Sequence, residues 1–382
     1  RPPRSTLFPY TTLFRSSFEM VSKWDTLFLF IMTLPIMGHV VILPIMLDVA
    51  GRDAWISILV SIPSAFALAY AIFRLQLRFP DLTIKEMLVR LLGKWFGSMV
   101  AIVLIVYFLF LTIVTFVALV DLTNIAFLPE TPRVVIIAWF LIFFTYAAAK
   151  GIKRIALTAG VLALIGMITG HTVTLMDSAK KDWSQLKPFL EYGLSPVLWG
   201  SLILISIWVE LLFLLCIPLK NIHEKRLFLF WSIGILLNAL MMFSTLTGVI
   251  TIFGLGQADN FLFPATEIVR IIELGFIDRF DVYALILMTF GSYIRCSLYL
   301  RIAYEMSLPS HASKWMERSI FWLYIAFIFF VTVYISAQQF RFEIIMDVYA
   351  YMVVLFPIPF ILLAISRRKK QNQASVQAGQ GG

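Results

Sequence analysis

The first residues suited to binding a small molecule lie in an apolar segment, residues 24–51, with the sequence WDTLFLFIMTLPIMGHVVILPIMLDVAG. Its Gly38–His39 pair is flanked by Pro35 and Pro44. Each proline removes a backbone donor and crowds the preceding turn, and glycine adds freedom, so we expect the helix to break or unwind between them. The alternative is a proline kink that holds no ligand.

A break here would leave the backbone groups of Met37, Gly38 and His39 without helical partners. In hydrocarbon such groups are tolerated only where protein or a water-filled cavity satisfies them, as in the discontinuous helices of membrane transporters. The ends of the broken helix would present a dipole and free carbonyls to charged groups of a ligand. We therefore predict that these three residues bind a ligand; the alternative is that His39 is a core histidine beside a kink.

Two charged residues, Glu210 and Arg295, lie inside other apolar segments. A charge at mid-bilayer costs on the order of 3 kcal/mol on insertion scales, so such residues usually face the bundle interior and find partners. Glu210 lies 13 residues after Val197, and Arg295 lies 13 residues after Val282. At about 1.5 Å per residue both are about 20 Å deep, which predicts an intramembrane ion pair. The alternative is that Arg295 snorkels and Glu210 is protonated or bonded to backbone.

The composition excludes most catalytic classes. Of 382 residues, 60% are hydrophobic and 14% are charged, and the mean hydropathy is +0.90, as in an integral membrane protein. Cys216 and Cys296 lie in apolar runs without disulfide or metal-site spacing, and the four histidines are scattered. No phosphate-binding loop, dinucleotide turn or Ser-His-Asp pattern is present. We expect no enzyme activity, no cofactor and no metal site.

The two ends of the chain differ from the apolar body. Residues 1–16, RPPRSTLFPYTTLFRS, match the translation of a common sequencing-library adapter, so we expect them not to be native and the native chain to begin near or upstream of Ser17. We expect residues 17–370 to form a single polytopic membrane domain. Residues 371–382, QNQASVQAGQGG, are expected to be a disordered cytoplasmic tail.

The body contains ten apolar segments of roughly 17–27 residues, about the length that a helix needs to cross the hydrocarbon core. They fall near residues 26–49, 54–75, 97–120, 133–149, 154–176, 197–219, 227–254, 281–304, 318–338 and 344–366. The sequence therefore predicts an all-α integral membrane protein with about ten transmembrane helices.

The distribution of positive charge predicts the orientation. With the N-terminus inside, cytoplasmic segments carry 19 Lys and Arg and outer loops carry 8. This bias places both termini in the cytoplasm. It also accounts for the net charge of +9 through water and anionic membrane lipids, without nucleic acid.

Ten segments with the first starting inside give segments 1–5 and 6–10 opposite topology, which favours a 5+5 inverted repeat. Segment 6, the partner of segment 1, is also irregular, with Glu210 beside Trp208 and Pro218 near its end. Two irregular helices at corresponding positions of two halves predict a binding site near the membrane midplane.

The outer loop at residues 254–281 is the longest connection. Beyond Pro264 it has one apolar side, while Glu267, Arg270 and Glu273 recur at three-residue spacing. This pattern predicts a short surface helix at the outer mouth of the bundle, which serves either as a lid or as a connector.

Four stretches carry a family resemblance: ILPIMLDVAGRDAWISIL, WSQLKPFLEYGLSPVLWG, IWVELLFLLCIP and FPATEIVRIIELGFIDRFDVYALI. Over residues 18–367 the chain resembles the spore germination receptor B subunits. These are a branch of the amino acid/polyamine/organocation transporter superfamily with the LeuT-type fold. The resemblance implies a 5+5 inverted repeat with broken helices 1 and 6. His39 departs from the small residues that related transporters tend to have after the equivalent of Gly38.

The resemblance implies a multi-pass protein of the spore inner membrane that senses a nutrient, such as an amino acid, together with an A-type subunit and a lipoprotein C-type subunit. If the fold is of this type, Tyr107, Ser206 and Trp208 face the centre and wall the ligand's side chain. Glu210 and Arg295 then border the same central space. In this interpretation Glu210 is also a ligand-binding residue.

Three functions fit these features. In a receptor, a ligand shifts the bundle between two states and partners read the shift. The second function is a proton- or sodium-coupled amino acid transporter, whose output is flux. The third is an ion-conducting pathway that the ligand opens. Neighbouring genes for A-type and C-type subunits favour the first, and uptake in proteoliposomes favours the second.

Overall fold

The computed structural model describes residues 20–80, 82–220, 226–272, 281–309 and 312–379. These ranges contain helices and connecting segments, with a single β-bridge between Val21 and Leu219. Residues 1–16, which we expect to be an adapter artefact, lie outside the described residues.

The helices follow one another closely along the chain. The α-helices are α1 (Lys23–Met37), α2 (Leu43–Ala50), α3 (Ala54–Arg78), α4 (Ile84–Leu92), α5 (Lys94–Ala126), α6 (Arg133–Lys150), α7 (Ile152–Met176), α8 (Leu194–Val209), α9 (Phe213–Cys216), α10 (Leu227–Phe253), α11 (Leu255–Ala258), α12 (Pro264–Arg270), α13 (Val282–Ser307), α14 (Lys314–Ser336), α15 (Gln339–Ala350) and α16 (Ile358–Gly379). A π-helical segment spans Gly38–Ile42, and 3₁₀ segments span Gly51–Asp53, Ser178–Lys180, Trp183–Leu186, Glu210–Leu212 and Tyr351–Leu355.

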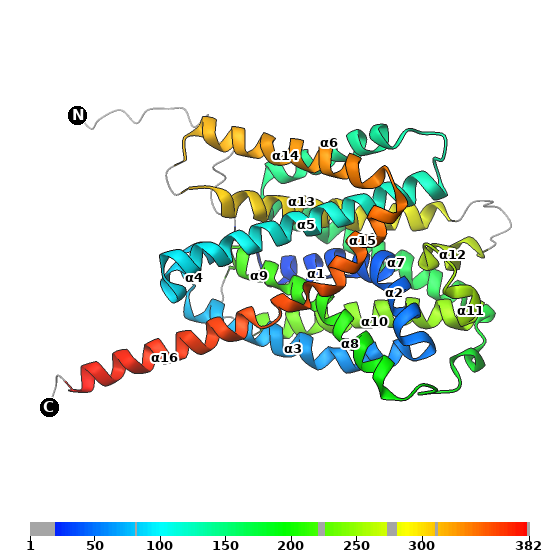
Figure 1. The fold of residues 1–382 in the computed structure, drawn as a ribbon, viewed down its shortest axis with the longest axis horizontal. Coiled ribbons are helices and arrows are strands. Elements are labelled where there is room, and N and C mark those ends of the chain that lie inside the picture. Colours follow the sequence, from blue (N-terminus) through cyan, green and yellow to red (C-terminus); the bar gives the residue numbers. More distant parts are fainter. Residues whose placement is uncertain (1–19, 81, 221–225, 273–280, 310–311, 380–382) are drawn as a thin grey trace, which may run out of the picture.

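Most of the long helices lie side by side along the long axis of the molecule (Figure 1). In the described part of the chain, nine helical stretches are long and apolar enough to cross a membrane. The first, Lys23–Arg78, contains two of the ten predicted segments, joined by the 3₁₀ turn Gly51–Asp53. The prediction of an all-α membrane protein is confirmed.

Both predicted irregular helices are interrupted, but each stays wound. Segment 1 passes from α1 through the π-helical segment into α2, and segment 6 passes from α8 through a 3₁₀ turn that begins at Glu210 into α9. Pro35 and Pro44 remove two donors, as expected, but a wider π turn keeps the backbone coiled. The expected unwinding around Met37 to Val41 is therefore corrected to a π-helical bulge.

Helix packing follows the predicted inverted repeat. Helix α1 of segment 1 packs against α10, which is segment 7, and α3, which is segment 2, packs against α8 of segment 6. Exchanging the two halves replaces segments 1 and 7 by segments 6 and 2, so it turns the first pair into the second. The pair α13–α6, which is segments 8 and 4, is related in the same way to the pair α5–α14, which is segments 3 and 9. The pair α5–α13, segments 3 and 8, maps onto itself and packs at the centre. The contacts between helices therefore show the inverted repeat, which similarity between residues of the two halves does not reveal.

The helix predicted after Pro264 is present as α12. It packs against α10, α13, α2 and the π-helical segment, and its Glu267 and Arg270 form an ion pair at 2.7 Å. Glu273, the third charged residue of the predicted pattern, lies outside the described residues. Helix α12 therefore packs over the interrupted part of the first segment.

The C-terminal segment differs from the expectation. Helix α16 continues to Gly379 and extends away from the bundle, so residues 371–379 are helical rather than a disordered tail (Figure 1). The sequence QNQASVQA explains the difference, since Gln and Ala favour helix and no proline or glycine interrupts the run before Gly379.

Gly97 gives a test of how closely α5 approaches α4. A Cβ on Gly97 would lie 2.7 Å from the Leu88 carbonyl oxygen and 2.7 Å from the Val89 Cα, which are backbone atoms that cannot rotate away. We predict that Gly97→Ala lowers stability by about 1–3 kcal/mol, measured as the thermal unfolding midpoint in detergent. The control is Gly170→Ala on α7, where a Cβ meets nothing within 4 Å. An equally stable Gly97 variant would contradict this packing.

Candidate ligand pocket and buried ion pair

A cavity of about 150 Å³ lies beside the interruption of the first segment. Its walls come from α1 and the π-helical segment, α7, α10, α12 and α13. We call this cavity the His39 pocket. Of the predicted ligand-binding residues, only His39 lines it.

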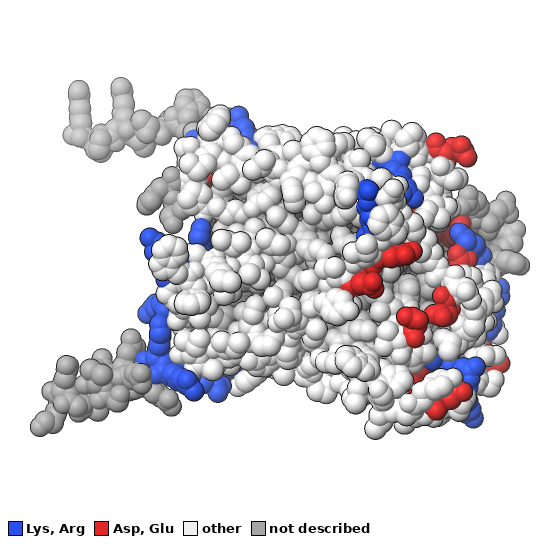
Figure 2. Space-filling view, viewed as in Figure 1, with Lys and Arg blue, Asp and Glu red and all other residues white. Residues whose placement is uncertain are grey.

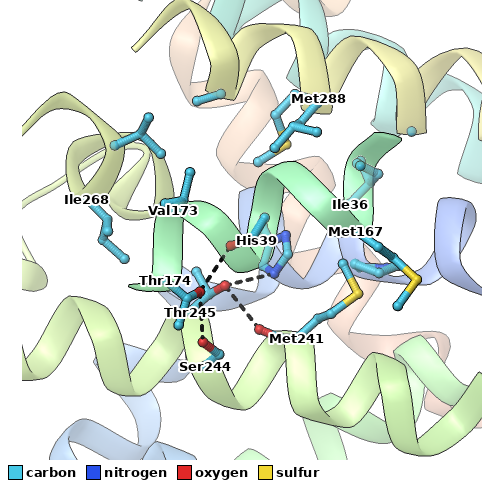
Figure 3. Close-up of a pocket in the computed structure, with 18 of the residues that line it drawn as sticks. Ile36, His39, Met167, Val173, Thr174, Met241, Ser244, Thr245, Ile268 and Met288 are labelled. Atoms are coloured by element: carbon cyan, nitrogen blue, oxygen red, sulfur yellow. Dashed lines mark hydrogen bonds between the residues drawn. The ribbon is translucent and has the colours of Figure 1, made fainter. Parts of the chain in front are cut away.

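One wall of the His39 pocket is polar (Figure 3). It carries the His39 ring and the hydroxyls of Thr174, Ser244 and Thr245. The His39 Nε2 lies 3.0 Å from the Thr245 Oγ1, and the Thr174 and Ser244 hydroxyl oxygens are 3.4 Å apart. The wall therefore offers hydrogen-bonding groups that can take either donor or acceptor roles.

The hydrogen bond of Thr245 fixes the role of the imidazole. The Thr245 hydroxyl donates its hydrogen to the Met241 carbonyl oxygen at 3.0 Å. When the single hydrogen of the hydroxyl is used in this way, Thr245 accepts from His39, which requires the tautomer with a proton on Nε2. In the neutral ring Nδ1 is then an acceptor, which suits a ligand that carries a donor such as an ammonium group.

The remaining walls are apolar and flexible. Ile268 of α12 and Val173 of α7 lie together on one side, with Met288 of α13 on another (Figure 3). Asp177 also lines the pocket and is paired with Lys181, with 2.6 Å between Oδ1 and Nζ. The pocket thus combines one polar wall with apolar surroundings, as small-molecule sites commonly do.

The two predicted ion-pair residues meet in the interior. Glu210 and Arg295 are both 0% exposed. The Arg295 Nη2 donates to the Glu210 Oε1 at 2.6 Å, and Nη1 donates to Oε2. The Tyr299 hydroxyl donates to Oε2 at 2.8 Å, and the Tyr349 hydroxyl donates to Oε1. Four donors therefore fill the lone-pair sites of the carboxylate.

The guanidinium has further partners on two more helices. The Arg295 Nε donates to the Thr115 Oγ1 of α5 at 2.6 Å, and Nη1 also donates to the Thr33 carbonyl oxygen of α1 at 2.8 Å. Thr115 in turn donates to the Leu111 carbonyl at 2.7 Å. We call Glu210, Arg295 and these partners the Glu210 network. A buried ion pair with all these partners satisfied avoids the cost of desolvated, unpaired charge.

The Glu210 network lies directly beyond the His39 pocket along two helices. On α13, Gly291 lines the pocket and Arg295 follows one helical turn later. On α1, Met32 lines the pocket, and the carbonyl of the next residue, Thr33, accepts from Arg295. A change in the pocket that moves α1 against α13 therefore acts on the ion pair.

Met37 and Gly38 lie in the packed core beside the pocket. Both are buried, and Met37 contacts Thr115, with 3.6 Å from its sulfur to Oγ1. A Cβ on Gly38 would lie 2.9 Å from the Met242 side chain, so the segment packs closely against α10 and that side chain would have to shift for a larger residue. The segment around Gly38 is coiled as a π helix instead of unwound.

The three residues predicted to wall the ligand's side chain do not line the His39 pocket. The Trp208 Nε1 donates to the Ser61 hydroxyl at 3.0 Å, between α8 and α3. Ser206 donates to the Ile203 carbonyl of its own helix at 2.5 Å. Tyr107 is 3% exposed, and the described residues offer its hydroxyl no hydrogen-bond partner.

Several residues of the site were missed from the sequence. Tyr299 follows Arg295 by four residues, the spacing that puts two side chains on one helix face, so it could have been found. Tyr349 and Thr115 carry no such signal, since only the folded chain brings α15 to Glu210 and α5 to Arg295. Thr245 and Ser244 are ordinary hydroxyls on a long apolar helix.

Comparison with known proteins agrees with this architecture. A family model described as spore germination protein matches residues 20–309. Spore germination protein XB of Bacillus anthracis is 27% identical over 280 residues, which are 73% of this chain and 78% of that protein. Spore germination protein KB of Bacillus subtilis (strain 168) is 26% identical over 262 residues, 66% of this chain and 69% of that protein.

A solved structure matches the fold. It is a Na⁺-coupled sialic acid symporter in a substrate-bound outward-open state, with a TM-score of 0.63 and 14% identity. The match covers 91% of this chain and 80% of the symporter. The chain therefore belongs to the spore germination protein family and is built on a LeuT-type transporter fold.

Proposed function

We propose that the chain is the B-type subunit of a nutrient receptor of the spore membrane and that it senses a small molecule, such as an amino acid, in the His39 pocket. Membership of the spore germination protein family supports the class of function. The observation that carries the proposal is a cavity with one polar wall beside the interrupted first helix of a transporter-like bundle.

The size and polarity of the pocket favour an amino acid with a short side chain. A dry cavity of roughly 150 Å³ holds a ring the size of benzene, so the pocket, at about 150 Å³, takes a ligand of comparable size. The His39 Nδ1 and the Thr245 hydroxyl oxygen accept from the ammonium group. Ser244, whose contact with Thr174 is long at 3.4 Å, turns its hydroxyl towards the carboxylate.

The Glu210 network is the contact through which the ligand acts. Binding that draws α1, α7 and α10 around the ligand shifts α1 against α13 and changes the alignment of Arg295 with Glu210 and the Thr33 carbonyl. A ligand shifts a two-state equilibrium only by its difference in affinity for the states. In this proposal the pocket has a different affinity for the ligand in the two states, and the ion pair is aligned differently in each state.

The partners are an A-type subunit and a lipoprotein C-type subunit, and the location is the spore inner membrane with both termini in the cytoplasm. The charge distribution supports this orientation. Figure 2 shows a group of Lys and Arg where α16 leaves the bundle and further Lys and Arg at the other end, where most of the Asp and Glu visible on this face also lie. An uncharged band separates the two ends, as in a protein that spans a membrane.

The second candidate is a secondary amino acid transporter coupled to protons or sodium. The specific observation in its favour is the likeness of the fold to a Na⁺-coupled symporter. For the receptor we predict that purified protein in proteoliposomes binds small amino acids without uptake that depends on a sodium or proton gradient. Gradient-driven accumulation of a radiolabelled amino acid would establish transport instead.

The Thr245 hydroxyl gives a test of the pocket. We predict that Thr245→Val raises the nutrient concentration for half-maximal germination by about tenfold, because the His39 Nε2–H loses its partner and the ring loses its orientation. Spores that carry the variant as their only copy of this subunit provide the measurement. Thr245→Ser keeps the hydroxyl and is the matched control. Equal responses from the Val and Ser variants would exclude the pocket from sensing.

The Glu210 network gives a second test. Glu210→Gln or Arg295→Gln each leaves one buried charge unpaired, so we predict a loss of about 3–5 kcal/mol, seen as a lower membrane level and unfolding temperature. The double variant removes both charges and is expected to be more stable than either single variant. It should still fail to respond to nutrient, since the contact that ligand shifts is gone. A double variant with a normal response would show that the pair is only structural.

A further inference from the structure

A second cavity, of about 690 Å³, lies at the end of the bundle where α16 emerges. Its walls come from the last turns of α3, from α4 and from α16. Five cationic side chains line it: Arg74, Arg78, Arg90, Arg367 and Lys369. We call it the basic pocket. It is separate from the His39 pocket, with which it shares no lining residue.

The positive charge of the basic pocket is not balanced by the described residues around it. No carboxylate is among its described lining residues, and none of the five cations has an ion pair with a described Asp or Glu. Five like charges around one cavity repel one another, so the arrangement is stabilised when an anion enters. The planar guanidinium groups match the geometry of phosphate oxygens.

Hydrogen bonds hold two of the cations in place, and a cation–π contact holds a third. The Arg78 Nη1 donates to the Ser366 Oγ of α16 at 2.6 Å, and the Lys369 Nζ donates to the Arg90 carbonyl oxygen of α4 at 3.0 Å. The Arg90 guanidinium lies over the Phe79 ring at 5.8 Å. The side chains are therefore positioned across the seam between α3, α4 and α16 before any ligand binds.

The remaining wall is apolar, with Leu77, Leu91 and Leu363 as lining residues. Exposed aromatic residues mark the same end of the bundle, since Trp95 and Phe96 at the start of α5 are 90% and 71% exposed. Such side chains gather at the level of lipid headgroups. A ligand with an anionic head and an apolar tail fits both the cations and the leucines.

We propose that the basic pocket binds the phosphodiester headgroup of an anionic membrane phospholipid, whose acyl chains continue along the apolar side of the bundle. A zwitterionic phospholipid carries a cationic group that the five cations repel. Basic pockets between helices on the cytoplasmic side of membrane proteins bind such headgroups. The lipid joins α16, which leaves the bundle, to α3 and α4 within it.

The test uses the full chain purified in an uncharged detergent, with unfolding followed by tryptophan fluorescence. Short-chain phosphatidylglycerol is expected to raise the unfolding midpoint in a saturable way, whereas phosphatidylcholine of equal chain length and inorganic phosphate are not. Midpoints raised equally by phosphatidylcholine would overturn the proposal. Equal effects of inorganic phosphate and phosphatidylglycerol would show that the pocket binds a free anion and would overturn the proposal of a lipid ligand.

Arg78→Gln with Arg90→Gln removes two of the five cations from two of the three walls. Each charge near a lipid surface is worth roughly a fivefold change in affinity, so the half-saturating lipid concentration is expected to rise roughly thirtyfold. The matched control is Lys94→Gln with Arg154→Gln, two exposed cations at the same end that do not line the pocket. An equal loss of lipid affinity in the control variant would show that the positive surface attracts anionic lipid in general, and would overturn a specific site.

If the variant does not fold, lipid binding is measured on the unaltered protein by native mass spectrometry. A phosphatidylglycerol adduct that survives exchange into fresh detergent supports the proposal, and its displacement by excess phosphatidylcholine overturns it. The variants Arg78→Lys and Arg90→Lys keep the charge but lose the planar group, so together they are expected to weaken binding less than the Gln pair does.

Discussion

A buried charge must find a partner, and the packing around the centre of this bundle depends on that requirement. Glu210 is fully buried, so an unpaired carboxylate there would cost several kcal/mol. Arg295 and two tyrosine hydroxyls satisfy it, and the guanidinium is satisfied in turn from α5 and α1. Five elements of the fold thus meet at a single ion pair. None of them can move independently without leaving a polar group unpaired.

This requirement also relates the two interrupted helices. The 3₁₀ turn that begins at Glu210 interrupts segment 6, and the π-helical segment interrupts segment 1. Arg295 touches both segments, through the carboxylate of one and the Thr33 carbonyl of the other. In a bundle whose halves pack as an inverted repeat, the irregular helices of both halves are therefore joined at one guanidinium.

The sequence predicted the features that have local causes. Spanning segments follow from hydropathy, α12 follows from its proline and its charge spacing, and equal depth follows from counting residues to Glu210 and Arg295. Features that depend on contacts between helices could not be predicted from the sequence. Prolines around Gly38 mark an interruption, but neighbouring helices decide whether it unwinds or widens into a π turn. Trp208 was expected at the centre, yet its partner on α3 holds it at a helix interface. The basic pocket needs α16 beside α3 and α4, and α16 lies far from these two helices in sequence.

The His39 pocket has methionines in four of its contributing walls: Met32, Met167, Met241 and Met288. An unbranched thioether has three rotatable bonds and a polarisable sulfur, so these walls reshape around different apolar groups with little strain. The polar wall fixes the orientation of a bound molecule, while the methionines fix little about its side chain. If the pocket binds the proposed nutrient, related molecules with the same charged end would then be accepted with graded affinity. The same sulfurs are open to oxidation, and a sulfoxide would turn an apolar wall polar. If the chain senses a nutrient in a dormant spore, as proposed, its sensitivity would then decline with chemical age, without any change in the gene.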